Sequence, residues 1–193
     1  MPHFFKYLLL ISLPFQLFAG SNNISLSASV NQTKSIQTKF SELEHASGGR
    51  LGVFAINTAN NSTIQYRAGE RFAFCSTSKV MTVGAILKQS EKNPNLLQKN
   101  ITYTQKDIDK STYSPITKLH VKDGMTVSGL CEAVIEYSDN TAMNLLSKIA
   151  AGTKAITMYA RSINDNKFRL DRLEPELNSA MPGDKRDTTT PAA

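Results

Sequence analysis

The sequence predicts a mixed α/β protein, and three observations along the chain support this fold class. A helical repeat of apolar residues comes first, a pair of β-branched and apolar runs separated by turn residues follows, and most of the remaining chain favours helix. Its 193 residues are 40% hydrophobic and 20% charged, which is ordinary for one globular domain. We therefore expect a single domain that combines helices with a β-hairpin.

The first helix and the hairpin are predicted from residue spacing. The helix has apolar residues at positions i, i+4 and i+7, namely Ile36, Phe40 and Leu43. Gly48-Gly49 then predicts its end. Residues 51–56 and 63–66 are apolar and β-branched runs on either side of Asn60-Asn61, the pattern expected of two strands joined by a turn.

Helical patterns dominate the chain from residue 77 onward. Residues 77–88 are apolar on nearly all sides, which predicts a helix buried at the centre, with inward Val80, Val83, Ala85, Ile86 and Leu87. Thr126 can cap a helix whose apolar residues are Val127, Leu130, Val134 and Ile135. The next helix carries Met143, Leu146 and Ile149 and ends at Gly152. Thr153 can cap a further helix with Ile156, Tyr159 and Ile163 inward.

Two other segments have no helical period. Residues 169–187 carry charges together with Pro175, Pro182 and Gly183, which predicts a long ordered loop. The N-terminus opens with His3 and Lys6 and then runs apolar to Ala19, too short to span a bilayer comfortably. We expect residues 1–20 to be a signal peptide, with an uncleaved interfacial anchor as the alternative. A polar segment over 21–35 and a globular domain over 36–193 would follow.

Composition excludes several classes of partner. The formal net charge is +6, but basic residues alternate with acidic ones instead of forming a basic stripe, so we expect no nucleic-acid partner. The three histidines are scattered and the chain has no CxxC or HExxH motif, so we expect no metal site. Cys75 and Cys131 are the only cysteines, and the sequence leaves open whether they pair or stay free.

The residues that suggest chemistry begin with Ser76-Thr-Ser-Lys79. Positions i and i+3 of a helix share a face, so the amine of Lys79 can reach the hydroxyl of Ser76. A lysine removed from water loses its proton more readily and can act as a base, and the helix N-terminus favours developing negative charge. Taken alone, the pattern favours an ordinary helix start over a catalytic pair.

Two further elements strengthen the catalytic interpretation. Ser138-Asp139-Asn140 lies between two predicted helices, where short polar residues usually serve as turns and caps. Next to Ser76, a second hydroxyl could pass a proton to a leaving nitrogen, and the amide of Asn140 could hold a carbonyl. Glu174 and Asn178 stand four residues apart in the long loop and could hold one water molecule, although a surface charge run is the alternative.

These three elements together resemble the class A serine β-lactamases, which combine Ser-x-x-Lys with Ser-Asp-Asn. The resemblance extends from about residue 40 to residue 193 and includes Met-Pro-Gly-Asp and Asp-Thr-Thr-Thr-Pro-Ala-Ala. It implies an α/β sandwich, the serine β-lactamase or penicillin-recognising fold, in which a helical domain packs with a mostly antiparallel sheet. The activity it implies is hydrolysis of the β-lactam amide through an acyl-serine intermediate, without a cofactor.

The resemblance also implies a role for individual residues. Ser76 would be the acylated nucleophile, Lys79 its proton-accepting neighbour, and Ser138 the proton shuttle to the β-lactam nitrogen. Glu174 would orient the hydrolytic water, and whether Lys79 or Glu174 serves as the acylation base stays open. The residues implied in substrate binding are Asn140, Asn178 and Tyr113.

Other implied features concern structure and location. Arg172 would pair with Asp187 at the base of the loop, and the bond before Pro175 would be cis. Cys75 matches a cysteine that, in one branch of the family, bonds to a residue beyond this chain, so Cys131 would not be its partner. We expect a secreted, periplasmic monomer that binds small β-lactam molecules and does not associate stably with a membrane after leader removal.

The sequence departs from the family in a longer stretch over residues 107–113 and in a missing motif, and it leaves two rival functions open. No Lys-Thr-Gly occurs, and we expect the 193 residues to be an incomplete domain that is inactive by itself. A cell-wall transpeptidase or carboxypeptidase shares Ser-x-x-Lys but not the water-holding loop. A β-lactam sensor acylates and stays acylated, so it should lack a deacylating glutamate. Glu174 and Asn178 argue against both rivals.

Overall fold

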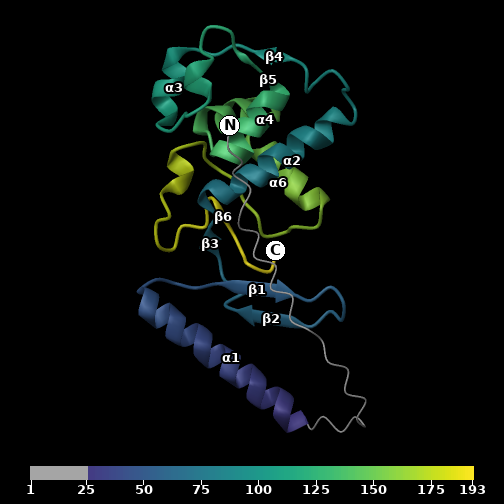
Figure 1. Ribbon diagram of the computed structural model, residues 1–193, viewed down its shortest axis with the longest axis vertical. Helices are drawn as coiled ribbons and strands as arrows, with labels where there is room; N and C mark the ends of the chain where they lie inside the picture. The colour runs from purple at the N-terminus through teal and green to yellow at the C-terminus, as the bar shows by residue number, and fades with distance from the viewer. Residues whose placement is uncertain (1–25) are drawn as a thin grey trace, which may run out of the picture.

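The computed structural model describes residues 26–193, so the signal peptide predicted over residues 1–20 lies outside the described residues. Six helices lie in this range: α1 (Leu26–Ser47), α2 (Ser78–Ser90), α3 (Gln105–Ser111), α4 (Val127–Tyr137), α5 (Asn140–Ile149) and α6 (Thr153–Ser162). The strands are short: β1 (Val53–Ile56), β2 (Thr63–Tyr66), β3 (Phe72–Ala73), β4 (Asn100–Ile101), β5 (Met125–Thr126) and β6 (Thr188–Thr189). Helices α2 to α6 gather at one end of the molecule, and α1 lies beside the β1–β2 hairpin at the other (Figure 1).

Each strand pairs antiparallel with one other strand. The predicted hairpin is confirmed, because β1 pairs with β2 from Val53 opposite Tyr66 to Ile56 opposite Thr63. Strand β3 pairs with β6, which brings Phe72 next to Thr189 although they lie far apart in the sequence. The guanidinium of Arg71 reinforces this long-range contact by donating to the carbonyl oxygens of Lys167 and Thr188. The end of the long loop is thereby tied to the strand that leads into α2.

The core forms where α2 packs against α4, α5 and α6. Its largest fully buried apolar side chains are Ile86, Leu130, Met143, Leu146, Ile156, Leu177, Val127 and Val134. The prediction that α2 is buried on nearly all sides is wrong in part. Val80 is 65% exposed and Leu87 48% exposed, because only one face of α2 meets the neighbouring helices within the described residues. The buried face includes Lys79, Val83 and Ile86, and it therefore carries the lysine of the predicted site.

The ends of the other helices test the capping predictions. Thr126 caps α4 as expected, with its hydroxyl accepting from the Gly129 backbone N–H. The prediction for α6 is wrong, because Gly152 is the N-cap and its φ of +96° favours glycine. Three residues expected to face the core are instead about half exposed, because each lies on an outer face or beyond its helix: Leu43, Ile135 and Ile163. Helix α1 also starts at Leu26, inside the expected polar segment 21–35.

Close packing of α2 against α6 depends on Gly84. A Cβ added there would lie 2.7 Å from the Tyr159 hydroxyl oxygen and 2.9 Å from its ring carbon Cε1. We expect Gly84→Ala to lower the free energy of unfolding by about 1–3 kcal/mol, because overpacking forces side chains off their rotamers. Gly69→Ala is the matched control, since nothing lies within 4 Å of that added Cβ. Chemical denaturation checks both variants, and equal stabilities would contradict the packing account.

Glu44 attaches α1 to the hairpin. Its carboxylate accepts from the Arg67 guanidinium at 2.8 Å, from the Tyr66 hydroxyl at 2.9 Å and from the Leu51 backbone N–H at 2.9 Å. The hydrogen bonds from Arg67, followed by the bond from Leu51, lower the pKa of Glu44 to about 2. One carboxylate therefore joins the helix, the segment just before β1 and the end of β2.

This attachment predicts an acid-sensitive contribution to stability. Because the pKa of Glu44 is lower in the folded protein, its contribution is present above about pH 4.5 and is lost as pH falls toward about 2. We expect the free energy of unfolding to decline less over this range in Glu44→Gln than in the parent. Urea denaturation at a series of pH values measures the slopes. Glu42→Gln, an exposed change on the same helix, should keep the parental slope.

Candidate active site

The site begins where a short 3₁₀ turn, Cys75–Thr77, leads into α2. Ser76 is exposed, whereas Lys79 is only 2% exposed and points inward from the first turn of the helix. The Lys79 ammonium lies 3.2 Å from the Ser76 hydroxyl oxygen, the neighbour relation expected from positions i and i+3. A solvent-accessible hydroxyl therefore stands beside a cation that the fold keeps away from water.

The second part of the site is the break between α4 and α5. Ser138 ends α4 in a left-handed conformation, with φ of +57°, and Asp139 caps α5. This turn aims three oxygens at Lys79, whose ammonium lies 2.7 Å from the Ser138 carbonyl oxygen, 2.9 Å from its hydroxyl and 2.7 Å from the Asn140 Oδ1. The amide nitrogen of Asn140 donates to the Ser111 carbonyl oxygen, which leaves one of its two hydrogens without a partner here.

Asp139 holds this turn in place. It is fully buried and accepts from the backbone N–H groups of Ile116, Thr117 and Ala142, and from the Thr117 hydroxyl. Several donors to one carboxylate compensate for its removal from water. The sequence pattern indicated a turn or cap for the triplet and a chemical role for Ser138 and Asn140, and the structure adds that Asp139 joins α5 to the segment after α3.

Glu174 completes the cluster from the long loop. Its side chain is 0% exposed, and its Oε1 lies 3.0 Å from the Lys79 ammonium, whose own side chain is 3% exposed. The other carboxylate oxygen, Oε2, accepts a 2.5 Å hydrogen bond from the Asn178 amide. An opposite charge at this distance inside a protein offsets much of the cost of burying each ion. Lys79 thus connects the two serines, Asn140 and Glu174.

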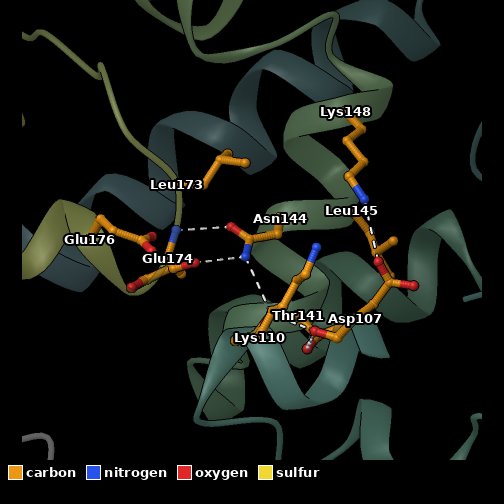
Figure 2. Close-up of a pocket in the computed structure, with 10 residues that line it drawn as sticks. Asp107, Lys110, Thr141, Asn144, Leu145, Lys148, Leu173, Glu174 and Glu176 are labelled. Atoms are coloured by element: carbon orange, nitrogen blue, oxygen red, sulfur yellow. Dashed lines mark hydrogen bonds and ion pairs between the residues drawn. The ribbon is translucent and has the colours of Figure 1, made fainter. Parts of the chain in front are cut away.

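Sequence reasoning missed Asn144, which fastens the backbone of Glu174. The Asn144 amide oxygen accepts from the Glu174 N–H, and its amide nitrogen donates to the Glu174 carbonyl oxygen, both at 2.9 Å. Figure 2 shows this pair of contacts between α5 and the loop. A signal was present, because Asn144 follows Asn140 by four residues and so occupies the same face of α5.

The base of the loop is closed by Arg172 and Asp187. Asp187 is 1% exposed and accepts from the Arg172 guanidinium at 2.5 Å, as well as from the backbone N–H groups of Asp171 and Arg172. The Glu174–Pro175 peptide bond is cis. Both features were expected from the family resemblance, and both are present in the loop.

Tyr113 stands at the edge of the cluster. It is 55% exposed, and its carbonyl oxygen accepts from the Asn140 backbone N–H at 2.8 Å. The preceding Thr112 has φ of +64°, an uncommon conformation for a β-branched residue. Tyr113 is therefore tied through its backbone to the turn that carries Asn140, while its ring faces solvent.

The structure was also searched for metal sites, membrane-spanning helices and disulfides within the described residues. Within residues 26–193, no group of three or more His, Cys, Asp or Glu side chains could hold a metal ion. No helix in that same range is long and apolar enough to cross a bilayer. Cys75 and Cys131 are both free, and burial raises the pKa of the Cys131 thiol to about 11.

Comparison with known proteins decides the family. The model of the beta-lactamase enzyme family matches residues 34–193. The chain belongs to this family. Among curated β-lactamases, OXY-2 from Klebsiella oxytoca is 53% identical over 161 residues, covering 83% of this chain and 55% of its own length. CTX-M-97 from Escherichia coli is 53% identical over 162 residues, covering 84% of this chain and 55% of its own.

Solved structures agree on the β-lactamase fold. The crystal structure of the β-lactamase from Desulfarculus baarsii is 51% identical with a TM-score of 0.80, covering 83% of this chain and 59% of that one. A class A β-lactamase described as the last common ancestor of Gram-negative bacteria is 51% identical with a TM-score of 0.78, covering 82% and 60%. The predicted class A resemblance and α/β fold are therefore confirmed. The chain spans about 55 to 60% of the length of these relatives.

Proposed function

We propose that the natural full-length protein carrying this sequence hydrolyses the amide bond of β-lactams through an acyl ester on Ser76, and so confers resistance to β-lactam antibiotics. The observation that carries the proposal is the position of the Lys79 ammonium. It lies within 3.2 Å of the Ser76 hydroxyl, the Ser138 hydroxyl, Asn140 and Glu174. One buried amine thus touches a nucleophile, a second hydroxyl, an amide and a carboxylate.

Acylation needs a proton acceptor beside the Ser76 hydroxyl. Lys79 lies 3.2 Å from this hydroxyl and 3.0 Å from Glu174, so the proton can pass to Lys79 or onward to Glu174. The Ser76 oxygen attacks the β-lactam carbonyl carbon, and the Ser76 backbone N–H at the helix start donates to the developing oxyanion. Collapse of this intermediate breaks the C–N bond. The Ser138 hydroxyl gives its proton to the departing nitrogen and regains one from Lys79, 2.9 Å away.

Deacylation needs a water molecule with a base beside it. Glu174 and Asn178 hold this water, and the Glu174 carboxylate removes its proton as the oxygen attacks the ester carbonyl. The support is that the Asn178 amide donates to one Glu174 oxygen while Lys79 faces the other. Glu174 then returns this proton through Lys79 to the departing Ser76 oxygen as the ester C–O bond breaks, and the product is the ring-opened acid.

Substrate recognition falls to Asn140 and Tyr113. The Asn140 amide nitrogen uses one hydrogen on the Ser111 carbonyl oxygen, so its second hydrogen can donate to the side-chain amide carbonyl of the β-lactam. Tyr113 offers an exposed aromatic ring at the edge of the cluster around Lys79 for the apolar part of that side chain. Neither residue moves a proton, so their loss should weaken binding more than turnover.

Neither rival function, transpeptidase or β-lactam sensor, needs the base that the loop supplies in Glu174. A transpeptidase would pass its acyl group to an amine, and a sensor would keep it, so neither benefits from a base at the ester. The buried Glu174, held by Asn144 and Asn178, favours the hydrolase. Residues 1–20 are proposed as its signal peptide, residues 36–193 as part of its catalytic domain, and the bacterial periplasm as the location of a monomeric enzyme.

The test uses purified natural full-length protein and the loss of β-lactam absorbance on hydrolysis of benzylpenicillin and nitrocefin. We expect turnover by the parent and no turnover by Ser76→Ala. Thr77→Ala is the matched control, because Thr77 is an exposed neighbour whose hydroxyl donates to the Phe74 carbonyl oxygen. A parent without turnover, or a Ser76→Ala variant that retains it, refutes the proposed function.

A further inference from the structure

A cavity of about 450 Å³ lies between the loop and helices α3 and α5, and it adjoins the cluster around Ser76 through Glu174, whereas Ser76, Lys79, Ser138 and Asn140 do not line it. The Asn144–Glu174 contact forms part of its wall, and Leu145 and Leu173 supply apolar surface. Its volume is within the usual range for small-molecule sites, about 300–1,000 Å³. The proposed mechanism makes no use of this space.

The charges that line the cavity are unevenly paired. Asp107 lies 3.5 Å from Lys148, and Glu174 pairs with Lys79. Lys110 and Glu176, in contrast, have no ion pair or side-chain hydrogen bond with any residue that the structure describes. Figure 2 shows Glu176 on the loop side of the cavity and Lys110 on the side of α3. An unpaired cation and an unpaired anion therefore line one cavity from two different elements.

This arrangement selects for a particular ligand chemistry. An anion would satisfy only Lys110, and a cation only Glu176, whereas a molecule with one charge of each sign at its two ends could pair with both. We propose that the cavity binds a small zwitterion, a free amino acid or short peptide, with its carboxylate at Lys110 and its ammonium at Glu176. Its apolar part would lie against Leu145 and Leu173.

Such a ligand would connect the loop to the helical part of the protein. Lys110 belongs to α3 and Glu176 to the 3₁₀ turn Glu176–Asn178, two residues beyond Glu174. A molecule held by both would add a bridge beside the one that Asn144 already makes. Binding to the folded state alone would also raise the thermal stability of the protein.

The test is a titration of the isotope-labelled natural full-length protein with the dipeptide alanyl-leucine, followed by nuclear magnetic resonance. Two matched probes each lack one charge: N-acetyl-alanyl-leucine and alanyl-leucinamide. We expect the signals of the Asn144 side-chain amide and the Ser111 backbone amide to shift saturably with the dipeptide. Each single-charge probe should bind about 5-fold more weakly or worse, since charge-assisted hydrogen bonds are the strong ones.

Exposed-residue variants locate the two charges. In Lys110→Gln, the dipeptide should lose its advantage over alanyl-leucinamide, and in Glu176→Gln its advantage over N-acetyl-alanyl-leucine. Lys106→Gln, on the same helix but outside the cavity, should bind as the parent does. The proposal is overturned by the absence of saturable shifts, by equal affinity for the three probes, or by shifts confined to Ser76 and Ser138.

Discussion

Replacing Glu174 with alanine is expected to trap the acyl-enzyme. The carboxylate is buried beside Lys79, and no other carboxylate among the described residues approaches Lys79 within 4 Å. Losing a positioned base costs about 10²- to 10⁴-fold in rate. Deacylation should slow by at least that factor in the natural full-length protein, while acylation of Ser76 remains measurable. Stopped-flow kinetics with benzylpenicillin would show a burst of one equivalent followed by very slow turnover.

Two comparisons make this result interpretable. Glu132→Ala, an exposed change on α4, should keep the parental rate of deacylation. Glu174→Gln should resemble the alanine variant, because an amide keeps the shape but does not accept the proton of water. If Glu174→Ala deacylated at the parental rate, Glu174 would not be the base, and the proposed role of the loop in deacylation would be wrong.

The second large effect is expected at Asp187, on stability. Asp187→Ala removes the anion that faces Arg172 and leaves three donors without their acceptor, two of them backbone N–H groups. Breaking a buried pair by removing one partner costs about 3–5 kcal/mol. We expect the free energy of unfolding to fall by this amount, and activity to fall with it as the loop that carries Glu174 loosens.

A surface pair provides the control for that experiment. Lys88 and Glu91 lie 2.6 Å apart, but both side chains are about 60% exposed. Glu91→Ala should therefore cost less than about 1 kcal/mol. Denaturant melts of the two variants should differ by several-fold in the stability lost. Equal losses would mean that Asp187 contributes no more than a surface ion pair, contrary to its place at the base of the loop.

Much of the fold could be predicted because turn and capping residues specify local structure by themselves, and the folded protein keeps that local structure. The turn residues between 51–56 and 63–66 specify a hairpin, and Thr126 specifies the start of α4. Burial within a helix was harder to predict. Val80 and Leu87 are apolar but exposed, because which face of α2 meets its neighbours depends on the placement of α4, α5 and α6. Helical spacing alone does not contain that information.

In the candidate site, too, contacts between near neighbours in the sequence could be predicted, whereas contacts between distant segments could not. Spacing predicted that Lys79 reaches Ser76, since i and i+3 are neighbours on any helix. Proximity of Ser138 and Glu174 to the same amine could be expected only from the family resemblance, because the contacts join residues 59 or more apart in the chain or come from a loop without a period. Spacing placed Asn144 on the same face of α5 as Asn140, but it could not show what Asn144 holds, because its partners in Glu174 are backbone atoms.

The most direct test of the account is the identity of the residue that carries the acyl group. The natural full-length protein, in its Glu174→Ala form, is mixed with benzylpenicillin, denatured in acid within seconds, digested and analysed by mass spectrometry. We predict that one intact benzylpenicillin is attached to the peptide that contains Ser76, and that Ser76→Ala abolishes the adduct. An adduct on Lys79, on Ser138 or on a peptide elsewhere, or no adduct at all, would contradict the account.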